Sequence, residues 1–351
     1  MTRIYSIEFL RLLTSLSVLL YHYRLFFAPY NSYSLFNFSE KKFDLPFYTF
    51  LEVFYTKGIY GVHVFYTISG FVFALVYLSS NEKISLKEFF VNRFGRLYPL
   101  HFATLIIVTF LLFANWFLNN SFVINPFHFN DIYHFFLQIF FISSWGFENG
   151  HSFNTPIWSV SVEVAIYGIF FLTLNYLKKY KIWLALFMCL VLLIINKIGF
   201  NDSLFLECAR LFFSGVLIYY IFAKSKFKQA LLFLSLILIV LSFVGNFKTY
   251  IFCPSLVLFT VMLEEKIKNI KIKNFFSVSG NLTYALYLLH FPVILLTIIT
   301  QKKLNLSGTM FEKHYFFFSF LIVLIILSYN CFKFYEKPMN KKIRNVLLRK
   351  N

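Results

Sequence analysis

The chain has 351 residues, of which 59% are hydrophobic and 14% are charged. Soluble domains average about 45–50% apolar and about 25% charged residues, so this composition excludes an ordinary soluble protein and predicts an all-α protein that crosses a membrane many times. The net charge of +18 does not indicate a nucleic-acid partner, because the basic residues gather in short loops between apolar runs, as in the cytoplasmic loops of membrane proteins.

Apolar runs recur from one end of the chain to the other, and a membrane-spanning helix needs about 20 such residues. The first run continues through "YHYRLFFAPY" without a small-residue cleavage site, which indicates a retained span and not a signal peptide. The ten predicted spans are 7–27, 57–78, 97–118, 158–177, 182–198, 204–222, 229–245, 250–264, 281–300 and 315–334.

The further apolar stretch 132–145 is ambiguous, and the charges of the connections decide whether it crosses the membrane. The connections rich in Lys and Arg are 79–96, 178–181, 223–228, 265–274 and the tail from 335. Loops of this kind face the cytoplasm, and they all fall on one side only if 132–145 does not cross. We therefore predict that 132–145 is re-entrant or interfacial and that the N- and C-termini are both cytoplasmic. Residues 1–351 are predicted to form a single membrane-embedded domain without an appended soluble domain.

The first predicted span contains two ionisable residues in "RLLTSLSVLLYH", and such residues inside a span indicate function. Arg11 and His22 lie on the same helical face, separated by about 16 Å along the axis. They could line one cavity, with Arg11 in the inner third of the span and His22 in the outer third. Two structural alternatives stay open: Arg11 pairs with Glu8 one turn earlier, and His22 is a structural histidine.

The next two segments place small residues inside one span and basic residues just before another, the span 97–118. In "GVHVFYTISGF" at 61–71, His63 lies in an outer third and Gly70 is small enough to allow a close helix approach. In "NRFGRLYPLH", Arg93 and Arg96 lie one turn apart and Tyr98 follows directly. Because arginine forks suit phosphates, these residues predict a cationic mouth facing the cytoplasm; the alternative is that they only follow the positive-inside rule.

Two later spans carry a carboxylate and a second histidine. Glu163, in "WSVSVE", lies at the same predicted depth as His22, so the two could act as a general base and its orienting partner. The alternative is that Glu163 pairs with Arg210. His290, in "YALYLLHFP", precedes Pro292, which lacks an N–H and so frees a backbone carbonyl. The position of His290 is equally typical of a structural and of a functional residue. The four cysteines show no spacing typical of a metal site.

Six motifs in order give the chain a family resemblance. They are the spacing of Arg11 and His22, "GVHVFYTISGF" at 61–71, "RFGRLYP" at 93–99, "WSVSVE" at 158–163, "YALYLLHFP" at 284–292 and "EKP" at 336–338. With these motifs the chain resembles the acyltransferase-3 family of bacterial integral-membrane acyltransferases, nearly end to end. One position departs from the family pattern: members often carry Asp where this chain has His63.

The resemblance implies an O-acetyltransferase of the bacterial cytoplasmic (inner) membrane. It implies acetyl-CoA as the donor, and as the acceptor a hydroxyl of a free or lipid-linked cell-surface carbohydrate such as O-antigen, capsule, exopolysaccharide or lipooligosaccharide. It makes His22 the catalytic residue, as general base or as brief acetyl carrier, and associates Arg11 with donor binding or catalysis. Arg93 and Arg96, with Tyr98 beside them, are the expected donor site. Membrane lipid is an expected partner, and neither a metal nor a nucleic acid is expected. The competing functions are a transporter or flippase and a non-catalytic partner in polysaccharide export.

Overall fold

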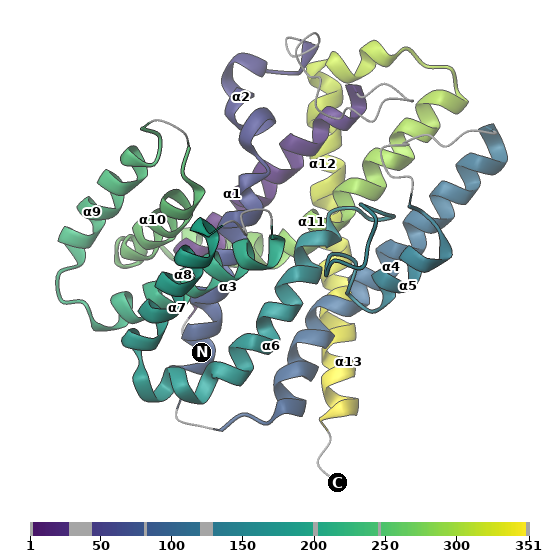
Figure 1. The fold of residues 1–351 in the computed structure, drawn as a ribbon. Helices are drawn as coiled ribbons and strands as arrows, with labels where there is room; N and C mark the ends of the chain where they lie inside the picture. Colours follow the sequence, from purple (N-terminus) through teal and green to yellow (C-terminus); the bar gives the residue numbers. More distant parts are fainter. Residues whose placement is uncertain are drawn as a thin grey trace. The chain divides into compact units, whose positions relative to one another are not determined.

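The computed structural model describes residues 3–27, 44–80, 83–119, 129–198, 203–244 and 247–348. The regular elements in these ranges are all helices, so the predicted all-α class is confirmed. Every predicted span lies on a helix; the last residue of the span 229–245 falls outside the described residues. The helices form two compact units (Figure 1).

Six helices are long and apolar enough to cross a membrane by length and composition, which supports a multi-pass membrane protein. They are α3 (Tyr60–Tyr77), α4 (Leu86–Asn119), α6 (Ile157–Tyr180), α8 (Leu204–Lys224), α11 (Ile270–Lys303) and the continuous run of α12 (His314–Cys331), the π-helix η5 (Phe332–Glu336) and α13 (Lys337–Leu347).

The four other predicted spans correspond to shorter or more polar helices. They are α1 (Tyr5–Tyr23), α7 (Ile182–Lys197), α9 (Lys228–Leu241) and α10 (Thr249–Met262). Both α9 and α10 have 14 residues, which corresponds to about 21 Å and is less than the roughly 30 Å of a bilayer core. The total of ten spans and the cytoplasmic termini therefore stay predictions.

The stretch 132–145 forms one short helix, α5 (Ile132–Ile139), and then turns. Asp131 caps the helix by accepting a 2.8 Å hydrogen bond from the backbone N–H of His134. Eight residues extend only about 12 Å, too short to cross a bilayer. That length agrees with the prediction that this stretch does not span the membrane.

The first unit comprises residues 1–14, 60–84 and 162–281. It is built on the close packing of α3 and α8, which lie side by side (Figure 1). A Cβ added at Gly70 of α3 would lie 1.8 Å from the backbone oxygen of Phe212, and one added at Gly215 of α8 would lie 2.0 Å from that of Thr67. Glycine is therefore required at both positions, and the close approach predicted at Gly70 is confirmed.

The second unit comprises residues 15–59, 85–161 and 282–351. It contains α2 (Tyr48–Lys57), α4, α5, α12 and α13, the short helices η1 (Arg24–Phe27) and η4 (Gly308–Glu312), and parts of α1, α6 and α11. Tyr23, the last residue of α1, is fully buried and donates a 2.9 Å hydrogen bond to the carbonyl of Phe311. Aromatic rings of Phe26, Phe317 and Phe320 surround it, so this end of α1 is held rigidly.

Replacing Gly215 by alanine is expected to destabilise the protein, because the new methyl group meets a backbone oxygen that moves only if α3 moves. Overpacking of this kind costs about 1–3 kcal/mol. Thermal unfolding of the purified protein in detergent measures the loss. Gly168→Ala on α6 is the matched control, since its Cβ would meet nothing within 4 Å. An equal unfolding temperature for the two variants would contradict the close approach.

Candidate functional site

Two histidines meet in the second unit. His22 lies in the last turn of α1 and His290 in α11, 268 residues apart, and Nδ1 of His22 is 3.2 Å from Nε2 of His290. Their ring centroids are 4.9 Å apart. His290 is almost fully buried, whereas His22 is half-buried. The structure thus gives His22 a side-chain partner that its position in the sequence did not indicate.

The backbone partners of the two rings assign their protons. Nδ1 of His22 is 3.0 Å from the carbonyl oxygen of Val18, and Nδ1 of His290 is 3.3 Å from that of Leu286. A carbonyl oxygen only accepts, so each Nδ1 carries hydrogen in the neutral ring. Nε2 of His290 is then an acceptor that shares the one Nδ1–H of His22 with the carbonyl of Val18. The same assignment leaves Nε2 of His22 with its lone pair, as a base or a nucleophile requires.

Pro292 explains why a buried amide lies beside His290. Proline has no N–H, so the carbonyl four residues earlier, at Leu288, loses its helical donor. Asn154 replaces that donor: its Nδ2 lies 3.2 Å from the oxygen of Leu288 and 2.9 Å from Oγ1 of Thr104. Asn154 and Thr104 are both fully buried. The carbonyl predicted to be freed by Pro292 is therefore satisfied by a side chain from the segment before α6.

The start of α6 is also hydrogen-bonded to α11, one turn before His290. The hydroxyl of Tyr287 lies 2.7 Å from Oγ of Ser159 and donates to the carbonyl of Pro156 at 2.9 Å. Residues of the "WSVSVE" and "YALYLLHFP" motifs thus meet directly. A third histidine, His151, lies in the loop before α6 and belongs to the same unit as His22. Burial lowers the pKa of His151, although Glu148 raises it, so His151 is mainly neutral near pH 7.

The "RFGRLYP" and "EKP" motifs meet where α4 lies beside α13 (Figure 1). Arg96 on α4 forms an ion pair with Glu336, whose side chain is almost fully buried. The hydroxyl of Tyr335 donates a 3.1 Å hydrogen bond to the carbonyl of Pro99. A guanidinium has five N–H donors, so this pairing leaves Arg96 further donors for a ligand.

The other predicted donor residues lie on the same helix. Arg93 is one turn before Arg96 on α4. Tyr98 stacks on the ring of Phe94, with centroids 4.4 Å apart, and lies 5.8 Å from the ring of Phe141. The structure therefore places Arg93, Arg96 and Tyr98 in the same unit as His22, while their role in donor binding stays a prediction.

Arg11 and Glu163 belong to the first unit. Nη1 of Arg11 lies 3.0 Å from Glu8, and Nε of Arg3 lies 3.2 Å from the other oxygen of the same carboxylate. The internal pair that was an alternative for Arg11 is therefore found. Glu163 is half-buried on α6. No ion pair joins it to Arg210 among the residues that the structure describes, and its partnership with His22 stays a prediction.

His63 finds a carboxylate in the first unit. Its Nε2 lies 3.4 Å from Glu207 on α8, and Arg210, one turn further, lies over the ring of Tyr250. His63, the position at which the sequence was expected to depart from the family pattern, thus faces an acid on the neighbouring helix. In the described ranges, no group of three or more His, Cys, Asp or Glu side chains is arranged to hold a metal ion.

The sequence analysis gave no role to Asn154 or Glu336, and it did not predict His290 as the partner of His22. Only Glu336 and His290 lay in motifs. Their signal was indirect, since Pro292 indicates an unsatisfied carbonyl but does not say which side chain satisfies it. These three side chains reach their partners through contacts between segments that are far apart in the chain.

Comparison with known proteins gives two matches. A family model described as an acyltransferase domain matches residues 4–332. Acyltransferase MdmB from Streptomyces mycarofaciens is 32% identical over 126 residues, which are 35% of this chain and 30% of that protein. The chain therefore matches about a third of the length of this curated relative. No solved structure matches the chain significantly.

Replacing Arg96 by glutamine is expected to destabilise the protein by about 3 kcal/mol, because it leaves the buried carboxylate of Glu336 without its counter-charge. The double variant Arg96→Gln/Glu336→Gln should regain at least half of that loss, since both groups are then neutral. Unfolding of the purified variants in detergent measures both effects. Additive losses in the double variant would show that the ion pair does not stabilise the fold.

Proposed function

Because the chain belongs to the acyltransferase-3 family, we propose that it transfers an acetyl group from acetyl-CoA to a hydroxyl of a cell-surface carbohydrate. The observation that carries the proposal is the histidine pair. His22 has a lone pair on Nε2, and its Nδ1–H faces Nε2 of His290 at 3.2 Å. A histidine oriented by a second group is the arrangement expected of a general base.

In the proposed reaction, Nε2 of His22 takes the proton of the acceptor hydroxyl as its oxygen attacks the thioester carbonyl. A new C–O bond forms, the C–S bond breaks, and the thiolate of CoA leaves. The proton on His22 then passes to that thiolate, which restores the neutral ring. His290 accepts the Nδ1–H throughout, so it orients His22 and stabilises the imidazolium. Base catalysis of this kind contributes typically about 10²–10⁴-fold.

Donor binding is assigned to the arginines in the first turns of α4. Arg93 and Arg96 present guanidinium groups one turn apart, and such groups bind phosphates in pairs of parallel hydrogen bonds. Tyr98 lies beside them, and Arg11 contributes a further positive charge to the donor path. Glu163 is proposed to raise the basicity of His22. Because basic loops of membrane proteins face the cytoplasm, this donor site is proposed to lie on the cytoplasmic side of a bacterial inner membrane.

The acceptor is proposed to be a sugar hydroxyl of O-antigen, capsule, exopolysaccharide or lipooligosaccharide, on a free or lipid-linked chain. Support comes from the family alone, because the relative is named only as an acyltransferase. Membrane lipid surrounds the apolar helices. The competing functions, a transporter or flippase and a non-catalytic export partner, predict that no acetyl-CoA is consumed.

His22→Ala should abolish acetyl transfer, with a loss of at least about 10²-fold, because the general base is removed. The chain and the variant are expressed in a host that bears surface polysaccharide, and base-labile acetyl groups on the purified polysaccharide are measured by proton NMR at equal protein level. His314→Ala, an exposed histidine at the start of α12, is the control. Acetylation that persists in His22→Ala would end the proposed role of this histidine.

His290→Leu should lower kcat about 10-fold and leave KM for acetyl-CoA unchanged, because one hydrogen bond to His22 is lost. His290→Gln keeps a side-chain acceptor and should recover part of the rate. Steady-state kinetics on purified protein separate the two constants. If both variants lose activity to the same extent, or if KM rises with kcat unchanged, His290 does not act through His22.

A further inference from the structure

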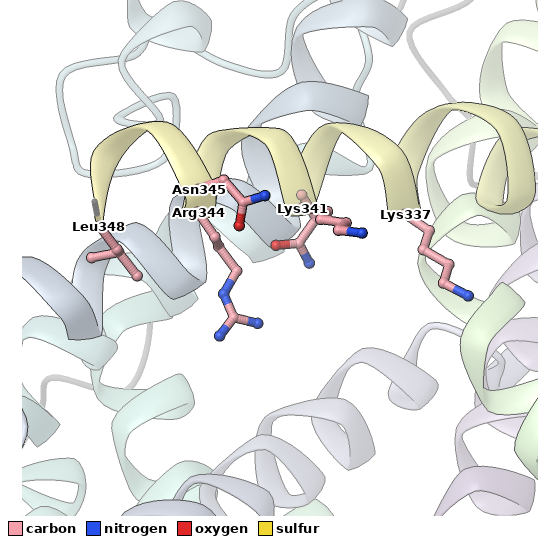
Figure 2. Close-up of a pocket in the computed structure, with 6 residues that line it drawn as sticks. Lys337, Lys341, Arg344, Asn345 and Leu348 are labelled. Carbon is pink, nitrogen blue, oxygen red and sulfur yellow. The ribbon is translucent and has the colours of Figure 1, made fainter. Parts of the chain in front are cut away.

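A basic groove runs along α13, outside the residues assigned so far. Its volume is about 620 Å³, within the range of about 300–1,000 Å³ typical of small-molecule sites. It is lined by Lys337, Asn340, Lys341, Arg344, Asn345 and Leu348. Figure 2 shows the side chains of Lys337, Arg344 and Leu348 projecting from the same side of the helix.

The sequence of α13 explains why this face is cationic. Residues 337, 341, 344 and 348 are spaced by four, three and four, so they share one helical face at about 100° per residue. The helix, KPMNKKIRNVL, contains no acidic residue. In the part of the chain that the structure describes, none of Lys337, Lys341 and Arg344 forms an ion pair with a carboxylate, and all three are exposed. Their charge is therefore available to a ligand.

The packing of α13 on α4 leaves this face uncovered. Gly95 of α4 approaches Asn340 and Ile343, with its Cβ position 3.1 Å from Oδ1 of Asn340 and 3.4 Å from Cγ2 of Ile343. This contact occupies the flank of α13 next to the groove. Because a larger residue at Gly95 would press on α13, the small residue lets the basic helix lie directly against the helix that carries Arg93 and Arg96.

Glu336, the acidic residue nearest to the groove in sequence, does not neutralise it. Its carboxylate is almost fully buried and is paired with Arg96 on α4. The same ion pair connects the start of α13 to the "RFGR" segment. Consequently the groove and the arginines assigned to the donor lie on one pair of packed helices, α13 and α4.

We propose that the groove of α13 binds the phosphorylated nucleotide end of the acyl-CoA donor. This inference rests on the proposed function and adds a second anchor to its donor site. Three cations spread over seven residues span about 10 Å, which suits a ligand with a diphosphate and a separate sugar phosphate. The amide groups of Asn340 and Asn345 offer both donors and acceptors, as the edge of an adenine base requires.

The test measures binding to the full chain in nanodiscs of neutral phosphatidylcholine, with CoA and with 3′,5′-ADP, a probe that keeps the 3′-phosphate and one 5′-phosphate of CoA but lacks its pantetheine arm. Lys341→Gln/Arg344→Gln should weaken both probes by about 10-fold or more, because charge-assisted hydrogen bonds to phosphate are lost. Lys342→Gln is the matched control: it removes one positive charge from the same helix at an exposed position that does not line the groove.

Each outcome separates this inference from the proposed function. If the affinity for 3′,5′-ADP is equal in the wild type, the double variant and Lys342→Gln, the inference that the groove binds the nucleotide is overturned. In that case, CoA binding by the wild type still supports acetyl-CoA as the donor. A wild type that binds neither probe overturns both. Loss of co-purifying phosphatidylglycerol in the double variant, with CoA affinity unchanged, assigns the groove to a lipid headgroup and overturns the inference. If 3′,5′-ADP binding is weakened in the double variant but the protein acetylates no polysaccharide, the nucleotide site in the groove is supported and only the proposed acceptor is contradicted.

Discussion

The carbonyl of Leu288 is the constraint on which the site depends. Pro292 removes its helical donor, and a polar group left unsatisfied in apolar surroundings costs several kcal/mol. Asn154 supplies the missing hydrogen bond and itself becomes fully buried. The segment before α6 is thereby held against α11, and Tyr287 and Ser159 add a second fastening one turn before His290. The position of His290, and with it the orientation of His22, follows from satisfying one backbone oxygen.

Two groups of charged side chains among the described residues are held in ion pairs. Arg96 neutralises the buried Glu336 and joins α4 to α13, while Glu8 lies between Arg3 and Arg11. Each pair offsets the cost of holding a charge away from water. The groove of α13 is the contrast, because its three cations have no carboxylate partner among the described residues. A structural role explains the paired charges, whereas the unpaired ones are explained by a phosphate-bearing ligand.

Much of the fold was predictable because helix formation here is local. Long apolar runs placed α3, α6, α8 and α12 within a few residues of their observed bounds, and Gly70 indicated a close approach that the structure bears out. The helices α4 and α11 were exceptions at their starts: they begin at Leu86 and Ile270, well before the predicted spans 97–118 and 281–300, so Arg93 and Arg96 lie inside a helix. The hydropathy pattern predicted only the apolar part of α4. The basic first turns belong to the same helix, but their low hydropathy kept them out of the predicted span.

The candidate site was predictable only in its parts. By itself the sequence determined the helical, multi-pass character of the chain, the basic loops, and the residue types of His22, Arg93 and Arg96, because each of these depends on composition or on spacing within one helix. Only the tertiary structure decided that His22 faces His290, that Arg96 pairs with Glu336 and that Asn154 caps Leu288. Those partners lie 268, 240 and 134 residues apart. No periodicity within a helix connects positions so distant; their contact is decided by how the helices pack.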